Sequence, residues 1–284
     1  MEFIVLSRFV ERPRKQVFTP FSVLQSWLRL ALNTSRSFLA IPTELTPEKL
    51  AGGTREAPLI ELNGLTKTYG LGDAAFQALK GIDLTIRKGE FVVIMGPSGS
   101  GKSTLMNLLG CLDTPTSGHY NYEGIAVETL DADQRSLLRR YALGFIFQGF
   151  NLLARTSALE NVELPLLYRG MSRKDRHEKA TAALTAVGLP TKLSSTPGEL
   201  SGGQQQRVAI ARAIVTEPST LFADEPTGNL DSVTTRDIIE ILTRLNVDRG
   251  ITVLMVTHDE NVAACAKRRV VIKDGLVESD STTP

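Results

Sequence analysis

The sequence predicts an α/β fold with a mixed, mainly parallel sheet, an antiparallel β subdomain and an inserted α-helical subdomain. The apolar run 91–95 and the run 251–256, which is apolar except for Thr252, are typical of strands buried on both faces of a parallel sheet. Residues 82–86 alternate between apolar and polar side chains, which indicates an antiparallel strand with one face in water. From about 150 to 200 the apolar spacing becomes helical, which predicts a helical insertion into the α/β core.

The composition excludes several classes of protein. With 42% hydrophobic and 22% charged residues, the 284-residue chain is typical of globular proteins. A net charge of +1 argues against a general nucleic-acid-binding surface. The two cysteines, Cys111 and Cys265, are far apart, which excludes a disulfide framework and a cysteine zinc site. No stretch reaches about 18 uninterrupted apolar residues, so the sequence predicts no membrane-spanning helix.

The first 57 residues differ from the rest. Residues 1–41 contain six basic side chains against two acidic ones, and 21–30 could form a basic amphipathic helix at a membrane surface. A targeting segment, a disordered tail and residues upstream of the true translation start remain alternatives. The prolines and glycines of 42–58 are typical of a linker. We therefore expect a disordered or amphipathic extension over 1–57 and a folded domain over 58–280.

A glycine-rich loop carries the clearest chemistry. It follows a predicted buried strand and opens a predicted helix, which is the context that the motif G-x-x-x-x-G-K-[ST] requires. Gly99 and Gly101 can adopt backbone angles closed to other residues, so that successive N–H groups converge on anionic oxygens. Lys102 can reach the β- and γ-phosphates, and the Ser103 hydroxyl can bind Mg²⁺. The sequence therefore predicts a P-loop NTPase core, whose loop consists of Gly96, Pro97, Ser98, Gly99, Ser100, Gly101, Lys102, Ser103 and Thr104.

Polar side chains follow three other predicted strands. Gln148, the pair Asp224 and Glu225, and His258 each lie where a buried strand ends. Because open α/β sheets bind ligands at the carboxyl ends of their strands, we expect these side chains to face one ligand. Asp224 is placed to hold Mg²⁺ through water, and Glu225 is placed to polarise an attacking water. His258 is interpreted as a contact to the γ-phosphate.

A second helix start shares the features of an anion site. Ser201 is a suitable N-cap, and Gly202 and Gly203 allow a close approach to the first helical turn. Such a helix start binds anions without a lysine. A plain capped helix is the alternative interpretation.

Tyr69 is a candidate for base recognition. It is predicted in a loop beside Gly70 and Gly72, where its ring could stack on a nucleotide base. A half-buried tyrosine at a strand end is the more common situation and remains the alternative.

Together and in this order, the motifs over 58–279 resemble the ATP-binding cassette of ABC transporters. The resemblance implies that Tyr69 stacks on adenine and that 96–103 is Walker A. It implies that 200–204, LSGGQ, is the signature motif. The same resemblance makes Gln148 the Q-loop glutamine, which joins Ser103 and Asp224 around Mg²⁺.

The remaining catalytic positions follow from the same resemblance. Asp224 is then the Walker B aspartate, and Glu225 is the catalytic glutamate. Asp231 belongs to the D-loop, and His258 is the switch histidine. Lys102, Gln148, Glu225 and His258 are thus the expected catalytic set, and ATP and Mg²⁺ are the expected cofactors.

The resemblance also implies partners. In this family two cassettes face each other head to tail, so ATP on Lys102 of one copy is capped by Ser201, Gly202, Gly203 and Gln204 of the other. Asp231 contacts the nucleotide across the same interface. We therefore expect a homodimer that acts on an integral membrane permease on a separate chain. An extracytoplasmic adaptor, reached through that permease, is a further expected partner, and no nucleic acid is expected. The expected location is peripheral, on the cytoplasmic face of the plasma (inner) membrane.

Finer agreement points to a subfamily. Residues 223–231, ADEPTGNLD, and 112–118, LDTPTSG, resemble the macrolide-exporter and lipoprotein-releasing (MacB/LolD-like) cassettes, which implies export or lipoprotein release. A non-transport ABC ATPase of cell division, translation or DNA repair is the alternative. Such relatives usually carry two cassettes, zinc cysteines or a long coiled coil, and this sequence has none of these.

Overall fold

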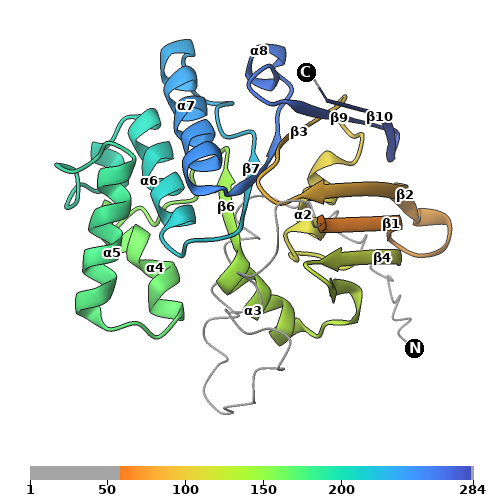
Figure 1. Cartoon of the computed structure of the whole chain (residues 1–284), viewed down its shortest axis with the longest axis horizontal. Coiled ribbons are helices and arrows are strands. Elements are labelled where there is room, and N and C mark those ends of the chain that lie inside the picture. The colour runs from red at the N-terminus through yellow and green to blue at the C-terminus, as the bar shows by residue number, and fades with distance from the viewer. Residues whose placement is uncertain (1–57, 283–284) are drawn as a thin grey trace, which may run out of the picture. The chain divides into compact units, whose positions relative to one another are not determined.

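The computed structural model describes residues 58–282 (Figure 1). The predicted extension over 1–57 and residues 283–284 lie outside the described residues. Within the described range, no helix combines the length and the apolar character that crossing a bilayer requires. In chain order the elements are β1 (Pro58–Tyr69), η2 (Gly72–Ala74), β2 (Phe76–Arg87), β3 (Phe91–Met95), α2 (Lys102–Leu109), β4 (Ser117–Tyr122), β5 (Ile125–Ala126), η3 (Val127–Thr129), α3 (Ala132–Ala142), β6 (Leu143–Phe147), α4 (Ala158–Tyr168), α5 (Arg173–Ala186), η4 (Pro197–Glu199), α6 (Gly202–Ile214), β7 (Thr220–Asp224), α7 (Ser232–Arg249), β8 (Thr252–Val256), α8 (Glu260–Ala263), β9 (Arg268–Lys273) and β10 (Leu276–Thr282).

A six-stranded sheet forms the centre of the fold, in the order β10-β9-β3-β8-β7-β6. The pairs from β9 to β6 are parallel, and β10 pairs antiparallel with β9. Alternate residues of β3 contribute to two hydrophobic cores, because Val93 packs with the α6 and α7 side and Val92 packs with the α2 side. The predicted doubly buried parallel strands are confirmed, and β9 and β10 form a hairpin at the C-terminal edge of the sheet.

A second, antiparallel sheet has the order β2-β1-β4-β5. The apolar side chains of α2 share one core with the inner residues of this sheet and with β3 and β8. The antiparallel β subdomain is thus confirmed, but its strands are longer than the sequence indicated. Tyr69 ends β1 and pairs with Phe76 of β2, so the prediction that it lies in a loop was wrong. The backbone hydrogen bonds of β1 and β2 extend order into that segment.

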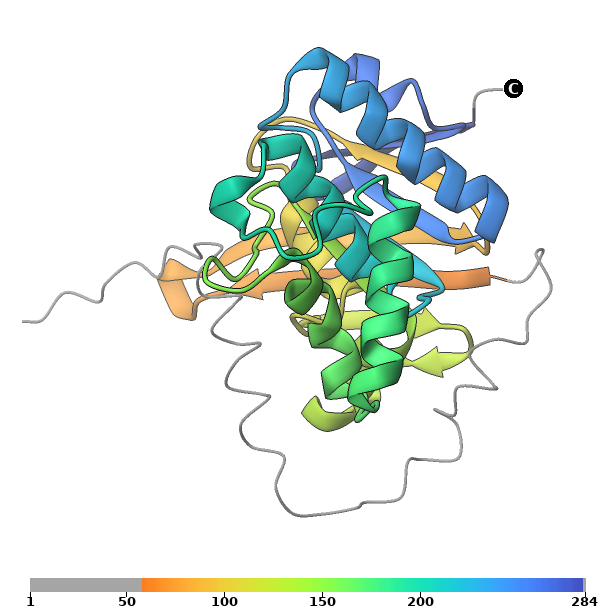
Figure 2. The same ribbon diagram turned by 90° about the vertical axis from the view of Figure 1, so that its left-hand side faces the viewer.

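The inserted helical subdomain consists of α4 and α5, which pack on each other and on α6 (Figure 2). Their buried residues, including Val162, Leu166 and Leu184, belong to the same core as the inner face of α6. Ser157 and Ser172 cap the two helices. The insertion lies inside the predicted range of about 150–200.

No helix or strand was predicted for the segment between α2 and β6. It forms β4, β5 and α3. The Asp131 side chain caps α3 by accepting a hydrogen bond from the Gln134 N–H. In turn, Gln134 Oε1 accepts a hydrogen bond from the Asp131 N–H. This Asp-x-x-Gln capping box is the sequence signal that could have located the helix.

Candidate nucleotide-binding and catalytic site

Three glycines shape the loop between β3 and α2. Gly96, Gly99 and Gly101 have φ of 144°, 77° and 105°. A Cβ on Gly96 would lie 1.9 Å from the Ile272 carbonyl oxygen, and a Cβ on Gly101 would lie 2.7 Å from that of Ala78. Because Gly101 offers no side-chain cap, the first N–H groups of α2 keep their hydrogen-bonding capacity for a ligand.

The polar side chains of this loop are arranged for an anionic ligand. Lys102 Nζ donates to the carbonyl oxygens of Gly96 and Pro97, both at 2.8 Å, so the ammonium lies across the loop. Ser103 is exposed. Ser100 is buried, and within the described part of the chain its Oγ has no hydrogen-bond partner. A buried hydroxyl without a partner costs stability unless a ligand pairs with it, which supports a polar ligand here.

Asp224 lies at the end of β7 in a partly buried position. Burial raises the pKa of its carboxyl, the neighbouring Glu225 raises it further, and Lys102 opposes the shift. A cation beside this carboxylate would relieve both the desolvation and the repulsion. The environment of Asp224 therefore fits a hard divalent ion such as Mg²⁺.

Glu225 and His258 form a close pair. His258 Nδ1 lies 2.9 Å from Glu225 Oε1, and 26% of the Glu225 side chain is exposed. Glu225 has φ of 45°, which is uncommon for a residue other than glycine, and its N–H donates to the Val256 carbonyl at 2.9 Å. Strain of this kind persists where the surroundings impose it and is common at functional sites.

Gln148 lies one residue beyond β6, and the β6–β7 register pairs Phe147 with Asp224. It therefore lies at the same sheet edge as Glu225. Its Nε2 donates to Asn229 Oδ1 at 3.3 Å, and Asn229 Nδ2 donates to the Gln148 carbonyl at 3.2 Å. The amide thus joins the end of β6 to the turn that follows Glu225.

The LSGGQ segment forms a capped helix start. Ser201 Oγ accepts from the Gln204 N–H at 3.3 Å, and Gln204 Oε1 accepts from the Ser201 N–H at 3.0 Å. A Cβ on Gly203 would lie 2.3 Å from Thr234 Cγ2, so this glycine is required by packing of α6 on α7 within the chain. Among the described residues, none of the hydrogen bonds of Ser201 or Gln204 reaches the loop 96–104.

Asp231 is engaged within its own chain. Its Oδ1 accepts from the N–H groups of Val233 and Thr234, each at 3.0 Å, so that it caps α7. The Thr234 hydroxyl donates to Oδ2 at 2.6 Å. These bonds hold the pKa of Asp231 below its usual range.

Tyr69 is half-buried at the end of β1, as the alternative interpretation allowed. Its hydroxyl donates to Asp113 Oδ2 at 2.9 Å, and Lys67 Nζ lies 4.9 Å from its ring centroid. Burial is the main cause that raises the pKa of Tyr69 to about 12; Asp113 adds to it, and a hydrogen bond with Thr104 opposes it.

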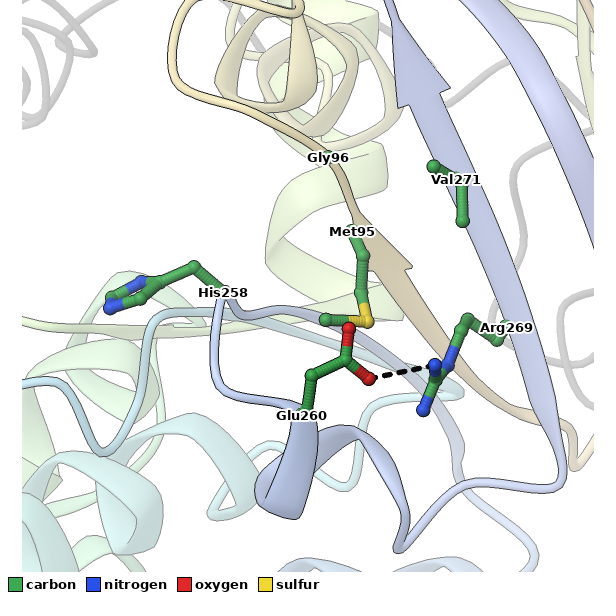
Figure 3. Close-up of a pocket in the computed structure, with 6 residues that line it drawn as sticks. All are labelled: Met95, Gly96, His258, Glu260, Arg269 and Val271. Carbon is green, nitrogen blue, oxygen red and sulfur yellow. Dashed lines mark hydrogen bonds and ion pairs between the residues drawn. The ribbon is translucent and has the colours of Figure 1, made fainter.

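Two hollows adjoin these residues. A pocket of about 230 Å³ beside the first glycine of the loop is lined by Met95, Gly96, His258, Glu260, Arg269 and Val271 (Figure 3). In it, Arg269 Nη1 donates to Glu260 Oε2 at 2.8 Å. A larger groove of about 740 Å³ runs from Glu225 and His258 along α7. Of the loop 96–104, only Gly96 lines either of these two hollows.

Two polar side chains of α6, Gln206 and Arg212, make hydrogen bonds that were not predicted from the sequence. Gln206 is fully buried, and its Nε2 donates at 2.5 Å to the Pro226 carbonyl, directly after Glu225. Arg212 donates to the carbonyls of Asn151 and Phe150 at 2.6 and 2.8 Å. Their polar character within an otherwise apolar helix face was the available signal, but the partners lie too far away in sequence to be identified from spacing.

Comparisons with known proteins agree with this geometry. A family model described as ABC transporter matches residues 79–228. The macrolide export ATP-binding/permease protein MacB of Syntrophobacter fumaroxidans is 55% identical over 225 residues, which cover 78% of this chain and 32% of that protein. The pyoverdine export ATP-binding/permease protein PvdT of Pseudomonas fluorescens is 50% identical over 227 residues, which cover 80% and 34%. The chain thus matches about a third of the length of these curated relatives.

A solved structure extends the comparison to the fold. The ATP-binding cassette MJ0796, a dimer in a post-hydrolysis state with ADP and Pi, aligns with a TM-score of 0.74 and 46% identity. The alignment covers 79% of this chain and 99% of that one. The chain therefore belongs to the ABC transporter family and carries an ATP-binding cassette, which is an ATPase domain.

Proposed function

We propose that this cassette hydrolyses ATP between two copies of the chain and thereby drives a membrane permease, in export or in lipoprotein release. The observation that carries the proposal is the Glu225–His258 pair, 2.9 Å apart at the sheet edge that also carries Gln148 and Asp224. The export proteins MacB and PvdT, each named as an ATP-binding/permease protein, support the transport role.

The proposed reaction is in-line attack of water on the γ-phosphate. Glu225 orients and polarises the water, and His258, hydrogen-bonded to Glu225, contacts the γ-phosphate. Lys102 exchanges its two carbonyl acceptors for the β- and γ-phosphates. The N–H groups at the start of α2 and the hydroxyl of Ser100 stabilise negative charge on the phosphates.

Mg²⁺ is the proposed metal. Ser103 and Gln148 are its proposed ligands, and Asp224 would hold it through water. The described residues contain no group of three or more His, Cys, Asp or Glu side chains that could hold a metal. Such a sparse protein ligand set suits Mg²⁺, which retains water and takes phosphate oxygens in nucleotide sites. When bound, the ion would neutralise charge on the β- and γ-phosphates.

We further propose that the second half of each site comes from another copy. Ser201, Gly202, Gly203 and Gln204 would cap the γ-phosphate bound to the partner copy, with Asp231 beside them, and Tyr69 would stack on the adenine in its own copy. MJ0796, which is similar over this region, forms dimers, in support of this arrangement. The cassette is proposed to span 58–280 and to lie at the cytoplasmic face of the inner membrane. An extracytoplasmic adaptor, reached through the permease, is a further proposed partner.

The test replaces Glu225 by Gln, which keeps the shape of the side chain and removes its charge. Turnover should fall by about 100-fold or more, since general-base catalysis contributes at least that factor. ATP affinity should stay near wild type, and dimers should accumulate with ATP. ATPase assays, equilibrium binding and size-exclusion chromatography measure the three quantities. Glu178→Gln, an exposed site on α5 that lines neither hollow, is the matched control and should leave all three unchanged.

Wild-type turnover in Glu225→Gln would contradict the assigned base. The same ATP-locked variant, captured from solubilised native membranes, should bring down an integral membrane permease. Recovery with ribosomes or DNA and without a membrane protein would instead support a non-transport ATPase.

A further inference from the structure

We infer that Lys67 and Asp113 are positioning residues, which hold the Tyr69 ring as a platform for the purine base at a fixed distance from the phosphate-binding loop. The inference rests on the proposed function, in which Tyr69 receives the base. It adds two residues that neither the motifs nor the proposed reaction uses.

Lys67 is held against one face of the ring. Its relative exposure is 9%, its Nζ lies 2.6 Å from Asp113 Oδ1, and it donates to the Thr114 carbonyl at 2.7 Å. Burial of an ammonium group is costly unless it is paired and hydrogen-bonded, and here it has both kinds of partner. Since Lys67 Nζ lies 4.9 Å from the ring centroid over one face, the base would stack on the opposite face of Tyr69.

Asp113 fixes the edge of the same ring. One carboxylate oxygen accepts from Lys67 and from the Thr114 N–H, and the other accepts from the Tyr69 hydroxyl at 2.9 Å. The ring is therefore restrained at its hydroxyl and over one face. A stacking surface that is already ordered loses less conformational entropy when a ligand binds.

The same network ties the ring to the helix that begins the phosphate site. After α2, Cys111 adopts φ of 55°, and the N–H groups of Leu112 and Asp113 both donate to the Asn107 carbonyl, at 2.8 and 3.2 Å. This reversal places Asp113 where its Oδ2 accepts a hydrogen bond from the Tyr69 hydroxyl. Since Lys102 begins that helix, the base platform and the phosphate cradle share one rigid support.

A positioning role and a merely structural role predict different losses. If Lys67 and Asp113 serve only the stability of the subdomain, their removal should weaken every ligand alike. If they orient Tyr69, their removal should weaken ligands that carry a base and spare ligands that consist of phosphate alone. ADP and inorganic pyrophosphate form such a pair, and neither is hydrolysed by the proposed reaction.

The experiment measures ADP and pyrophosphate binding to the full chain by isothermal titration calorimetry. Lys67→Met and Asp113→Asn should each weaken ADP binding by about three- to tenfold, a part of the loss that complete removal of base–aromatic stacking causes. Pyrophosphate affinity should change by less than about twofold, so the ratio of ADP affinity to pyrophosphate affinity falls. Lys179→Met, which breaks a 2.7 Å ion pair with Glu217 remote from the motif residues, is the matched control and should preserve the ratio.

A double-mutant cycle adds a second readout. Tyr69→Phe removes the hydroxyl that donates a hydrogen bond to Asp113. In the Tyr69→Phe background, Asp113→Asn should therefore reduce ADP affinity little further. Equal losses for ADP and pyrophosphate, or an unchanged ADP affinity in both variants, would overturn the positioning role.

Tyr69→Ala separates this inference from the proposed function. It should weaken ADP at least as much as either positioning variant. If Tyr69→Ala leaves ADP binding intact, the base-stacking assignment itself fails. If Tyr69→Ala weakens ADP while Lys67→Met and Asp113→Asn do not, only the positioning inference fails.

Discussion

Individual glycines in the phosphate loop serve different physical needs. Gly96 has no room for a side chain, because a Cβ would meet the Ile272 carbonyl of the neighbouring strand β9 at 1.9 Å. Gly99 has open space around it, and only its φ of 77° favours glycine. The motif pattern requires glycine at 96 and leaves the residue at 99 open, in agreement with a packing requirement at Gly96 and only a conformational preference at Gly99.

This difference predicts unequal costs for the same substitution. Gly96→Ala should lower the free energy of unfolding by at least about 2 kcal/mol, since backbone must move to accept the methyl group. Gly99→Ala should cost about 1 kcal/mol, the penalty for a left-handed residue with a Cβ. Chemical denaturation of the two variants measures both. Equal costs would show that the packing contact with β9 does not restrict the loop.

At this scale the sequence predicted residue types better than residue partners. Lys102, Asp224, Glu225 and His258 were identifiable because each follows or opens a recognisable strand or helix. Gly203 was noted for ligand approach, but its surroundings show a packing role against Thr234 that no local pattern reveals. Lys67 and Asp113 meet across 46 residues, and such a contact exists only once the β1 and α2 regions are folded together.

Among the secondary-structure elements, α6 connects the signature segment to the Q-loop. Arg212 donates to the carbonyls of Phe150 and Asn151, two consecutive residues with φ of 59° and 50°. Burial without a carboxylate partner lowers the pKa of Arg212 to about 10. The Phe150 ring would lie 3.7 Å from a Cβ on Gly202, so the loop also touches the start of the helix. The guanidinium therefore stabilises a strained loop from the helix that carries LSGGQ.

Loss of the two hydrogen bonds from Arg212 should make the loop at Phe150 and Asn151 more mobile, while helix α6 stays folded. Arg212→Met should cost about 2 kcal/mol of unfolding free energy, as for hydrogen bonds from a charged donor. Hydrogen exchange should accelerate over 148–156. Arg207→Met, on the same helix, breaks the 2.7 Å contact with Asp237 and serves as the control, with acceleration near α7 instead. Unchanged exchange over 148–156 in Arg212→Met would contradict this role.

Element prediction failed where regular patterns are interrupted. The register of β1 against β2 shifts at several points between Pro58 and Thr68, so alternation of apolar and polar residues is lost within a continuous strand. For this reason the sequence pattern did not indicate a strand as far as Tyr69 and placed this residue in a loop. The buried strands β3, β7 and β8 were predicted well, because uninterrupted apolar runs do not depend on register.

For the whole molecule, the central claim is that a complete ATP site needs two chains. Within the described residues, the capping hydrogen bonds between Ser201 and Gln204 join these two residues to each other and do not reach the loop 96–104. The glycines at the start of α6 pack against Leu230 and Thr234 of the same chain. The fold class could be predicted from sequence, but this division of the site could be expected only through the family resemblance. Spacing along one chain does not indicate which copy completes the site.

Subunit complementation tests this claim most directly. Lys102→Ala removes the phosphate lysine, and Ser201→Phe blocks the signature segment, so each variant alone should be inactive as an ATPase. In a mixed head-to-tail dimer, one site combines the intact loop of the Ser201→Phe chain with the intact signature of the Lys102→Ala chain. An equimolar mixture should therefore recover about a quarter of wild-type ATPase activity, given random pairing and independent sites. Recovery near that level supports the shared site; no recovery, although mixed dimers are shown to form, would contradict it.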